Sequence, residues 1–177
     1  MNVALDPPLD ETPERVRELL APLRHDFSIA VHTAGNAFAV GAIIRVAHNF
    51  LAKEIILVGD APHYEKASMG MEKYESIVRV ADDDAFFAYV TGRPVFAFER
   101  EPARRSLYDV SSFPERVVLL FGSERFGLSA DVVRRCDDVL AIPLYGVNQS
   151  LPLAVAAGVA MNEWARLHHG RRARTGD

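Results

Sequence analysis

Short apolar segments alternate with helix-like segments along most of this chain, and this alternation restricts the fold more than any other feature. The segment 117–121 (VVLLF) is apolar throughout, which is typical of a strand that is covered on both faces of a parallel sheet. Strands are predicted at 27–32, 54–58, 77–80, 94–98, 117–121 and 139–142, and helices at 40–51, 84–90, 129–135 and 151–168. The pattern predicts an α/β fold in which helices cover both faces of a parallel sheet.

A length of 177 residues suits a single domain spanning 1–177. Residues 1–26 are expected to form a helical extension, in which Thr12 is the N-cap of a helix and Pro13 its first residue. The stretch 99–114 is polar and is interrupted by prolines, so we expect a long excursion at the carboxyl edge of the sheet. Ligands of such sheets bind beyond the carboxyl ends of the strands. The chemistry is therefore expected in the loops that follow Phe98, Phe121 and Ile142.

Composition and charge indicate the cellular compartment of the protein better than they indicate its function. The net charge of −4 argues against a general nucleic-acid coat, but residues 168–177 form a basic tail that either binds phosphates or is simply solvated. The single cysteine, Cys136, excludes an internal disulfide and favours a reducing compartment. Residues 1–6 do not resemble a signal peptide, and no apolar stretch approaches the ~20 residues that cross a bilayer. We expect a cytoplasmic protein without a membrane partner.

Several common catalytic motifs are absent or incomplete. The loop 122–129 (GSERFGLS) has the glycine spacing of a P-loop, but Leu128 stands where a P-loop requires lysine and Glu124 would repel phosphates. No G-x-G-x-x-G follows a predicted strand, and no G-x-S-x-G is present. The histidines and Cys136 lack the spacing of metal ligands. The sequence therefore disfavours an NTPase, a dinucleotide fold, a serine hydrolase and a metal site.

Three segments, taken together and in order, resemble the motifs of the SpoU-type RNA 2′-O-ribose methyltransferases, which belong to the SPOUT superfamily. A further segment, 66–70 (KASMG), also looks like a family segment. The resemblance extends from about Phe27 to Leu167, nearly the whole chain. The three motif segments are 36–47 (NAFAVGAIIRVA), 120–128 (LFGSERFGL), and 142–144 (IPL) followed by 150–156 (SLPLAVA).

The resemblance implies a SPOUT fold with a deep C-terminal trefoil knot, a homodimer with its active site near the subunit interface, and S-adenosylmethionine as the cofactor. Family members bind this cofactor largely through backbone groups of the knot loops. Physical chemistry agrees, because adenine needs backbone donors and acceptors in an apolar slot, and a glycine lets the chain approach a ligand closely. The positions carried over as cofactor-binding are Phe98, Gly122, Ile142, Leu144, Ser150 and Leu151.

The same resemblance assigns catalysis to Arg45, Glu124 and Asn36. Arg45 lies off the apolar face of its predicted helix and by itself would be interpreted as a solvated arginine. The family's arginine is proposed to act as a base, but a guanidinium is a poor base, so we favour a role in holding a phosphate and stabilising the developing alkoxide. Glu124 would orient an arginine or a loop. Ser150 either hydrogen-bonds within the site or caps the last helix.

Two positions depart from the family pattern. The motif-one asparagine usually stands six residues before the arginine, where this chain has Ala39, and proline replaces the motif-three asparagine at position 152. Proline is tolerated in the first turn of a helix, and Asn148 is near enough in sequence to compensate. The main hypothesis is an S-adenosylmethionine-dependent methyltransferase acting on a ribose 2′-hydroxyl of tRNA or rRNA. The alternatives are a catalytically silent RNA-binding or cofactor-binding module and a SPOUT enzyme that methylates a base.

Overall fold

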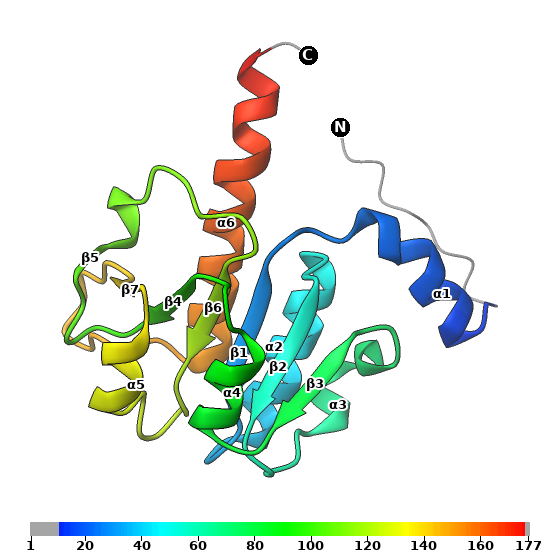
Figure 1. Cartoon of the computed structure of the whole chain (residues 1–177), viewed down its shortest axis with the longest axis horizontal. Helices are drawn as coiled ribbons and strands as arrows, with labels where there is room; N and C mark the ends of the chain where they lie inside the picture. Colours follow the sequence, from blue (N-terminus) through cyan, green and yellow to red (C-terminus); the bar gives the residue numbers. More distant parts are fainter. Residues whose placement is uncertain (1–10, 176–177) are drawn as a thin grey trace.

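The computed structural model describes residues 11–175, with side chains described through His168. Within residues 11–175, seven strands form one parallel sheet with helices on both faces (Figure 1). The strands are β1 (Ser28–His32), β2 (Glu54–Val58), β3 (Ile77–Val80), β4 (Val95–Phe98), β5 (Arg105–Ser106), β6 (Val118–Phe121) and β7 (Asp138–Ala141). The helices are α1 (Pro13–Leu20), α2 (Ala37–Asn49), α3 (Glu65–Ser68), α4 (Asp83–Tyr89), α5 (Ala130–Arg135) and α6 (Leu153–Thr175), with 3₁₀ turns η1 (Ala21–Leu23), η2 (Met71–Lys73) and η3 (Leu107–Asp109).

The order of the strands in the sheet is β3-β2-β1-β6-β4-β7-β5, and every pairing is parallel. The predicted parallel α/β architecture is therefore confirmed. Strand β7 lies between β4 and β5, although it follows both of them in the chain. Phe98 pairs in register with Phe121 of β6 on one side and with Leu140 of β7 on the other. As a result, the carboxyl ends of β4, β6 and β7 lie side by side.

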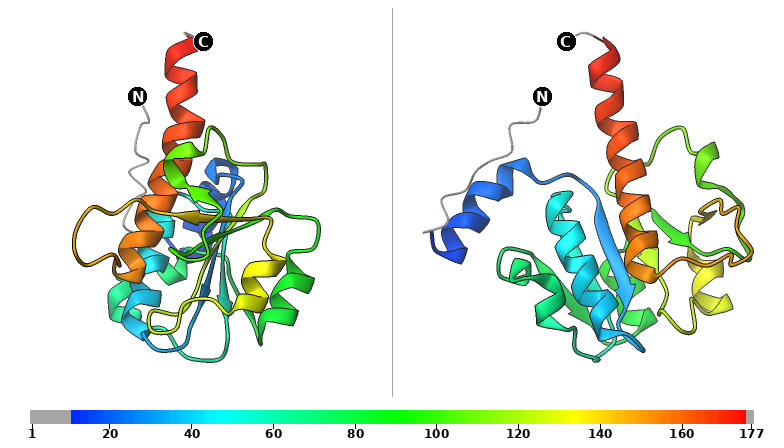
Figure 2. Two further views of the ribbon diagram at one scale, coloured as in Figure 1. Left: turned by 90° about the vertical axis from the view of Figure 1, so that its left-hand side faces the viewer. Right: turned by 180° about the vertical axis from the view of Figure 1, so that it is seen from behind.

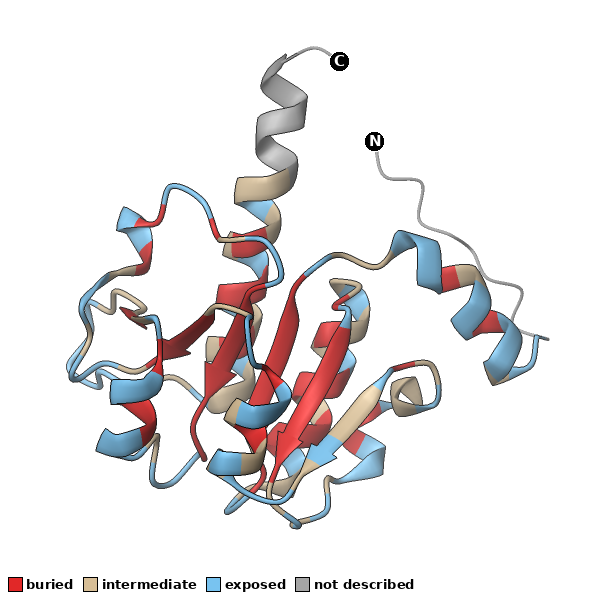
Figure 3. Cartoon of the chain, in the orientation of Figure 1, coloured by how far each residue is buried: buried red, intermediate tan, exposed pale blue. Residues whose placement is uncertain are grey.

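Two hydrophobic cores fill the two sides of the sheet. Helices α2 and α6 cover one face, and α4 and α5 cover the other (Figure 2). In β6, Leu119 and Phe121 belong to the first core, and Val118 and Leu120 belong to the second. The unbroken apolar run of this strand thus has a physical cause, because side chains alternate between two dry faces. Figure 3 shows the central strands buried throughout, whereas exposed residues lie on the helices, on the loops and on the edge strands β3 and β5.

The excursion that follows β4 is more regular than the sequence predicts. It contains the two-residue strand β5, which pairs with β7 at the edge of the sheet, and the turn η3. Helix α3 and turn η2 were also not predicted, because elements this short carry no periodic signal. Thr12 caps α1 as expected. Residues 1–10 of the N-terminal extension and the side chains of the predicted basic tail beyond His168 lie outside the described part of the chain.

The amino ends of the strands carry two buried carboxylates, each at the centre of a cluster. In the Glu54 cluster, Glu54 accepts hydrogen bonds from Arg93 Nη1 (2.6 Å), from the Tyr89 hydroxyl (2.6 Å) and from Ser28 Oγ (3.1 Å). Burial alone would raise the pKa of Glu54, but the hydrogen bonds from Tyr89, Arg93 and Ser28 outweigh it and lower that pKa. The carboxylate is therefore held in its ionised form.

The second of these clusters, the Glu75 cluster, joins the N-terminal extension to the body of the domain. The side chain of Glu75 is fully buried and accepts two hydrogen bonds from Arg24 (2.7 and 3.0 Å), while His48 Nδ1 of α2 lies 2.8 Å from it. Arg24 also donates to the carbonyl oxygens of Ala52 and Tyr74. Burial would raise the pKa of Glu75, but His48 and Arg24 outweigh it and lower that pKa.

Candidate active site

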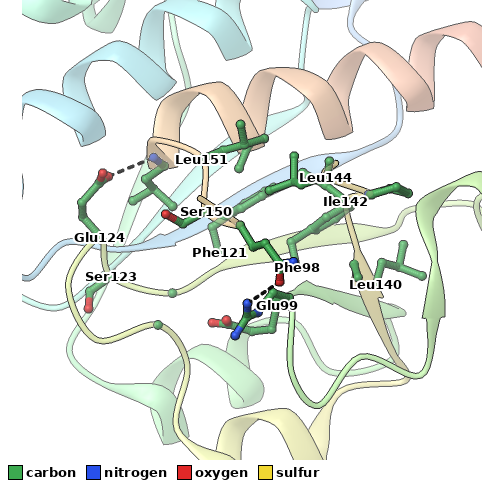
Figure 4. Close-up of a pocket in the computed structure, with 18 residues that line it drawn as sticks. Phe98, Glu99, Phe121, Ser123, Glu124, Leu140, Ile142, Leu144, Ser150 and Leu151 are labelled. Carbon is green, nitrogen blue, oxygen red and sulfur yellow. Dashed lines mark hydrogen bonds between the residues drawn. The ribbon is translucent and has the colours of Figure 1, made fainter. Parts of the chain in front are cut away.

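A cavity of about 450 Å³ opens at the carboxyl ends of β4, β6 and β7. Its volume falls in the range of small-molecule sites, about 300–1,000 Å³, and it lies where ligands bind in parallel α/β sheets. Figure 4 shows the side chains that converge on it from the three strand-end loops and from the start of α6. The six residues predicted to bind cofactor all line this cavity, namely Phe98, Gly122, Ile142, Leu144, Ser150 and Leu151.

The interior of the cavity is mainly apolar. Phe98 and Phe121 stack at its base with ring centroids 4.8 Å apart and planes 10° apart, and Leu140, Ile142 and Leu151 complete the apolar wall. The polar residues that line the cavity beside this wall are Glu99, Arg100, Ser123, Glu124, Gln149 and Ser150. Such a slot suits a flat, weakly polar ring with polar groups at its edge.

The loop 122–128 is folded back on itself. Ser123 and Gly127 form an antiparallel bridge, in which Gly127 N–H donates to the Ser123 carbonyl (2.9 Å), and Ser123 Oγ accepts from Phe126 N–H (3.1 Å). A Cβ on Gly122 would lie 2.2 Å from the carbonyl carbon of Gly127. The need for glycine at 122 is therefore set by this loop's own backbone. The expectation that this glycine also allows the close approach of a ligand stays a prediction.

Glu124 holds the start of the last helix. Its Oε2 accepts a hydrogen bond from the backbone N–H of Leu153 (3.0 Å), the first residue of α6. Ser150 does not cap this helix, because its hydroxyl donates to Asn148 Oδ1 (2.9 Å) and the helix begins three residues later. Of the two roles predicted for Ser150, the structure shows a hydrogen bond within the pocket loop. Glu124 thus ties the motif-two loop to motif three.

Glu99 is a pocket residue that the sequence interpretation missed. It directly follows β4, lines the cavity and is half-buried. Its Oε1 accepts a hydrogen bond from Leu128 N–H (2.7 Å), and both carboxylate oxygens lie against Gly127, which has a left-handed backbone (φ +64°). Burial raises the pKa of Glu99, and the hydrogen bond from Leu128 only partly opposes this. The neighbouring Arg100 donates to Gln149 Oε1 (2.8 Å) across the mouth of the pocket.

The predicted catalytic residues of motif one lie on α2, outside the cavity lining. Arg45 is exposed. Asn36 is the N-cap of α2, where its Oδ1 accepts from Ala39 N–H (3.0 Å). The structure brings Glu124 to the pocket but does not place Arg45 or Asn36 among the residues that line it. The side chain at the family's motif-one position, Ala39, is buried, whereas Pro152 is exposed.

Other chemistries find little support in the described part of the chain. No cluster of three or more His, Cys, Asp or Glu side chains there is arranged to hold a metal ion. None of the helices described is long and apolar enough to span a membrane. Cys136 is buried, and this burial raises the pKa of its thiol to about 12. A thiol in that state is a poor nucleophile.

The fold and the cavity define an α/β protein with a small-molecule site built from three strand-end loops. The chain belongs to the SpoU rRNA Methylase family, whose model matches residues 26–162. It is 31% identical over 140 residues to a 23S rRNA (adenosine(1067)-2′-O)-methyltransferase of Streptomyces laurentii. This match covers 75% of this chain and 51% of the relative. It is 28% identical over 158 residues to a tRNA (guanosine(18)-2′-O)-methyltransferase of Thermus thermophilus, covering 86% of this chain and 80% of the relative.

Among solved structures, the chain resembles the SpoU methyltransferase AviRb from Streptomyces viridochromogenes in complex with AdoMet. The TM-score is 0.73 at 27% identity, and the match covers 82% of this chain and 59% of AviRb. The chain therefore spans about half the length of the Streptomyces laurentii relative and somewhat more of AviRb. The family and the α/β fold are shown by these likenesses.

Proposed function

We propose that this protein is an S-adenosylmethionine-dependent methyltransferase that modifies a ribose 2′-hydroxyl of tRNA or rRNA. One observation carries the proposal: the predicted cofactor-binding residues, far apart in the sequence, converge on one apolar cavity at the carboxyl edge of the sheet. The relatives named as 2′-O-methyltransferases of tRNA and rRNA, and the AdoMet complex of AviRb, support the same assignment.

The residues present suit this cofactor. The apolar wall around Phe98, Ile142 and Leu151 suits an adenine ring, and polar residues line the cavity beside it. When bound, S-adenosylmethionine supplies a methyl group on a sulfonium, which passes to the ribose oxygen while the electron pair of the broken bond stays on sulfur. The hydroxyl proton is released to solvent. We assign Arg45 to hold the RNA phosphate and stabilise the negative charge that develops on that oxygen.

A homodimer is part of this proposal. Arg45 is exposed on α2 and does not line the cavity of its own protomer, so an RNA bound there would need a cavity offered by a second copy. Exposed apolar side chains on α6 and α2, Val155, Val159 and Phe38, supply a surface for such a contact. Light scattering at micromolar concentration is expected to give the mass of a dimer. A monomer there would contradict a shared active site.

We further propose that residues 1–177 form one SPOUT domain whose C-terminal part is threaded into a trefoil knot. The family resemblance carries this proposal, and the placement of β7 beside β4, with β5 paired only to β7, is compatible with it. The helical extension 1–26 and the basic tail 168–177 belong to the same domain. A reducing, cytoplasmic setting is consistent with a lone buried cysteine.

Methyl transfer from radiolabelled S-adenosylmethionine to bulk RNA, followed by mapping of the labelled nucleotide, tests the proposed function. Label on a ribose is the expected result, and label on a base would replace the proposal with a base-methylating enzyme. Calorimetry with S-adenosylhomocysteine in metal-free buffer is the companion measurement. Cofactor binding without methylation of any RNA would favour the silent module, for which the departures at Ala39 and Pro152 are the specific observation.

A further inference from the structure

Glu99 lines the cavity, and its carboxylate has one oxygen bonded to a backbone donor and one oxygen without a described donor. Oε1 accepts Leu128 N–H at 2.7 Å, and within residues 11–175 no hydrogen bond to Oε2 is found. Glu99 is half-buried and stands one residue beyond the end of β4, beside the stacked rings of Phe98 and Phe121 (Figure 4). Such a carboxylate can accept further hydrogen bonds.

The other polar side chains of the cavity also have protein partners, and Glu124, whose second oxygen has no described donor, is exposed. Glu124 binds Leu153 N–H, Ser123 Oγ binds Phe126 N–H, and Ser150 donates to Asn148. Arg100 is bonded to Gln149 across the mouth. Glu99 is therefore the half-buried carboxylate of the pocket that keeps an oxygen to accept hydrogen bonds from a ligand beside the apolar wall.

We propose that Glu99 recognises the ribose of the cofactor, accepting hydrogen bonds from its 2′- and 3′-hydroxyl groups while Oε1 remains on Leu128. Two neighbouring hydroxyl donors match the two-oxygen fork of a carboxylate, and an acidic side chain beyond a parallel strand binds ribose in other α/β folds for the same reason. Neutral hydroxyl groups also suit a half-buried site better than an ammonium group, which loses more hydration energy on burial. The inference rests on the proposed function, because it presumes an adenosine ligand.

Glu99 would act on the loop and the ligand together. The same carboxylate lies against Gly127 and bonds Leu128, so it anchors the loop whose backbone fixes Gly122. A ligand hydroxyl on Oε2 would then hold the cofactor and the motif-two loop to one side chain. Glu99 is accordingly a specificity-determining residue, and its expected signature is selectivity for the ribose hydroxyls.

A ligand–variant cycle isolates this contact. The dissociation constants of 5′-methylthioadenosine and of its 2′,3′-dideoxy analogue are measured by calorimetry for the wild type, Glu99→Ala, Glu99→Gln and the control Glu101→Gln. Glu101 is the adjacent acid, and its side chain is highly exposed and does not line the cavity. In the wild type and in Glu101→Gln, loss of the hydroxyl groups is expected to weaken binding by about 10- to 100-fold, as for hydrogen bonds to a charged group. In Glu99→Ala this penalty should fall below about threefold.

Each outcome of this experiment supports or overturns the proposed role of Glu99. An equal penalty in the wild type and in Glu99→Ala overturns the proposal and leaves Glu99 as a loop anchor only. A Glu99→Ala variant that loses affinity for S-adenosylhomocysteine but not for 5′-methylthioadenosine, which lacks the amino-acid moiety, assigns Glu99 to the ammonium group and also overturns it. If the wild type binds neither the nucleosides nor S-adenosylhomocysteine, the proposed function fails, which this cycle separates from a failure of Glu99. Intact folding of each variant is checked by its thermal unfolding.

Discussion

The acids at the two ends of the sheet differ in the number of hydrogen-bond donors that the protein gives them. At the amino ends, Glu54 and Glu75 are surrounded by donors, and those hydrogen bonds lower their pKa values in spite of burial. At the carboxyl ends, Glu99 has one backbone donor, and burial raises its pKa. The acids at the amino ends are satisfied by the protein itself, whereas the acid at the carboxyl ends is left with an unused acceptor.

This difference distinguishes acids that stabilise the folded protein from an acid that is available to bind a ligand. A fully bonded buried pair contributes stability only as a unit, and removal of one member is costly. A half-satisfied acid in a cavity costs stability but is ready to bind a ligand, a trade that is common at functional sites. The following changes test this contrast in order of decreasing effect.

Removal of the carboxylate at the centre of the Glu75 cluster should have the largest effect. Glu75→Gln leaves the part-buried Arg24 without its anionic partner, so the free energy of unfolding is expected to fall by about 3–5 kcal/mol. Urea unfolding followed by circular dichroism measures this loss. In the fraction that remains folded, affinity for S-adenosylhomocysteine should be unchanged, because the cluster lies at the opposite end of the sheet from the cavity.

Glu18→Gln provides the matched control, since Glu18 pairs with Arg15 on an exposed helix surface and should change stability by less than about 0.5 kcal/mol. The pH dependence provides a second measurement. Because the folded pKa values of Glu54 and Glu75 are lowered, their contribution is fully present above the unfolded value, about pH 4.3, and is lost as the pH falls through the folded values. A wild-type protein whose stability did not decline below about pH 4 would contradict the contrast.

The substitution Arg45→Ala tests function without touching either end of the sheet. If Arg45 stabilises the developing oxyanion or holds the phosphate, methyl transfer to RNA should fall by about 10²–10³-fold. Stability should shift by no more than about 0.5 kcal/mol because the side chain is exposed, and cofactor affinity should stay the same. Arg45→Lys keeps the charge but not the planar fork and should restore little activity.

Arg134→Ala is the control for this prediction. Arg134 is an exposed arginine on α5 that pairs only with the neighbouring Asp131 among the residues described. Its removal should leave methyl transfer within about twofold. Full activity in Arg45→Ala would show that Arg45 is an ordinary solvated residue.

Gly122→Ala should damage the carboxyl-end loop itself. The new Cβ would meet Gly127 at 2.2 Å, so the loop must shift and the free energy of unfolding should fall by about 1–3 kcal/mol, together with a loss of S-adenosylhomocysteine binding. Calorimetry and thermal unfolding measure the two effects. Gly158→Ala on α6 is the control: its Cβ would lie 3.8 Å from Val46 Cγ1, an ordinary contact. Binding lost with unchanged stability would show that a ligand, and not the loop, requires this glycine.

The smallest effect, and one of opposite sign, is expected at Glu99. Glu99→Gln keeps an oxygen for Leu128 N–H but removes a carboxylate whose ionised form is disfavoured by burial. Since a raised folded pKa means that stability is lost as the pH rises through it, the variant at pH 7 should be as stable as the wild type or more stable by up to about 1 kcal/mol. A clear destabilisation in denaturant unfolding would place Glu99 with the acids at the amino ends.

Much of this architecture can be predicted from the order of the residues. The apolar run of β6 predicts a strand with two buried faces, and the spacing of strands and helices predicts a parallel sheet. The two-residue strand β5 and the four-residue helix α3 could not be predicted, because they are too short to show a period. The insertion of β7 between β4 and β5 also escapes periodicity, which reports local structure and not the order of strands.

The candidate site, too, could be predicted only in part from the sequence. Residues such as Phe98 and Ile142 could be placed at the cavity because strand ends and motifs locate them. The reason for glycine at 122 could not be predicted, since it depends on the backbone of Gly127 across a loop. Glu99 belongs to none of the three motif segments, and only its position after β4 could have pointed to it. Whether Arg45 reaches a cavity of a second copy is a question that one chain's sequence does not address.

The placement of β7 also determines when the cavity can exist. Its walls come from the loops that follow β4, β6 and β7, and β7 follows both β4 and β6 in the chain. A chain that has collapsed onto its first strands therefore has a sheet but no pocket. A ligand of this cavity stabilises only the fully assembled protein. During refolding, the appearance of ligand-binding capacity would mark the pairing of β7 with β4.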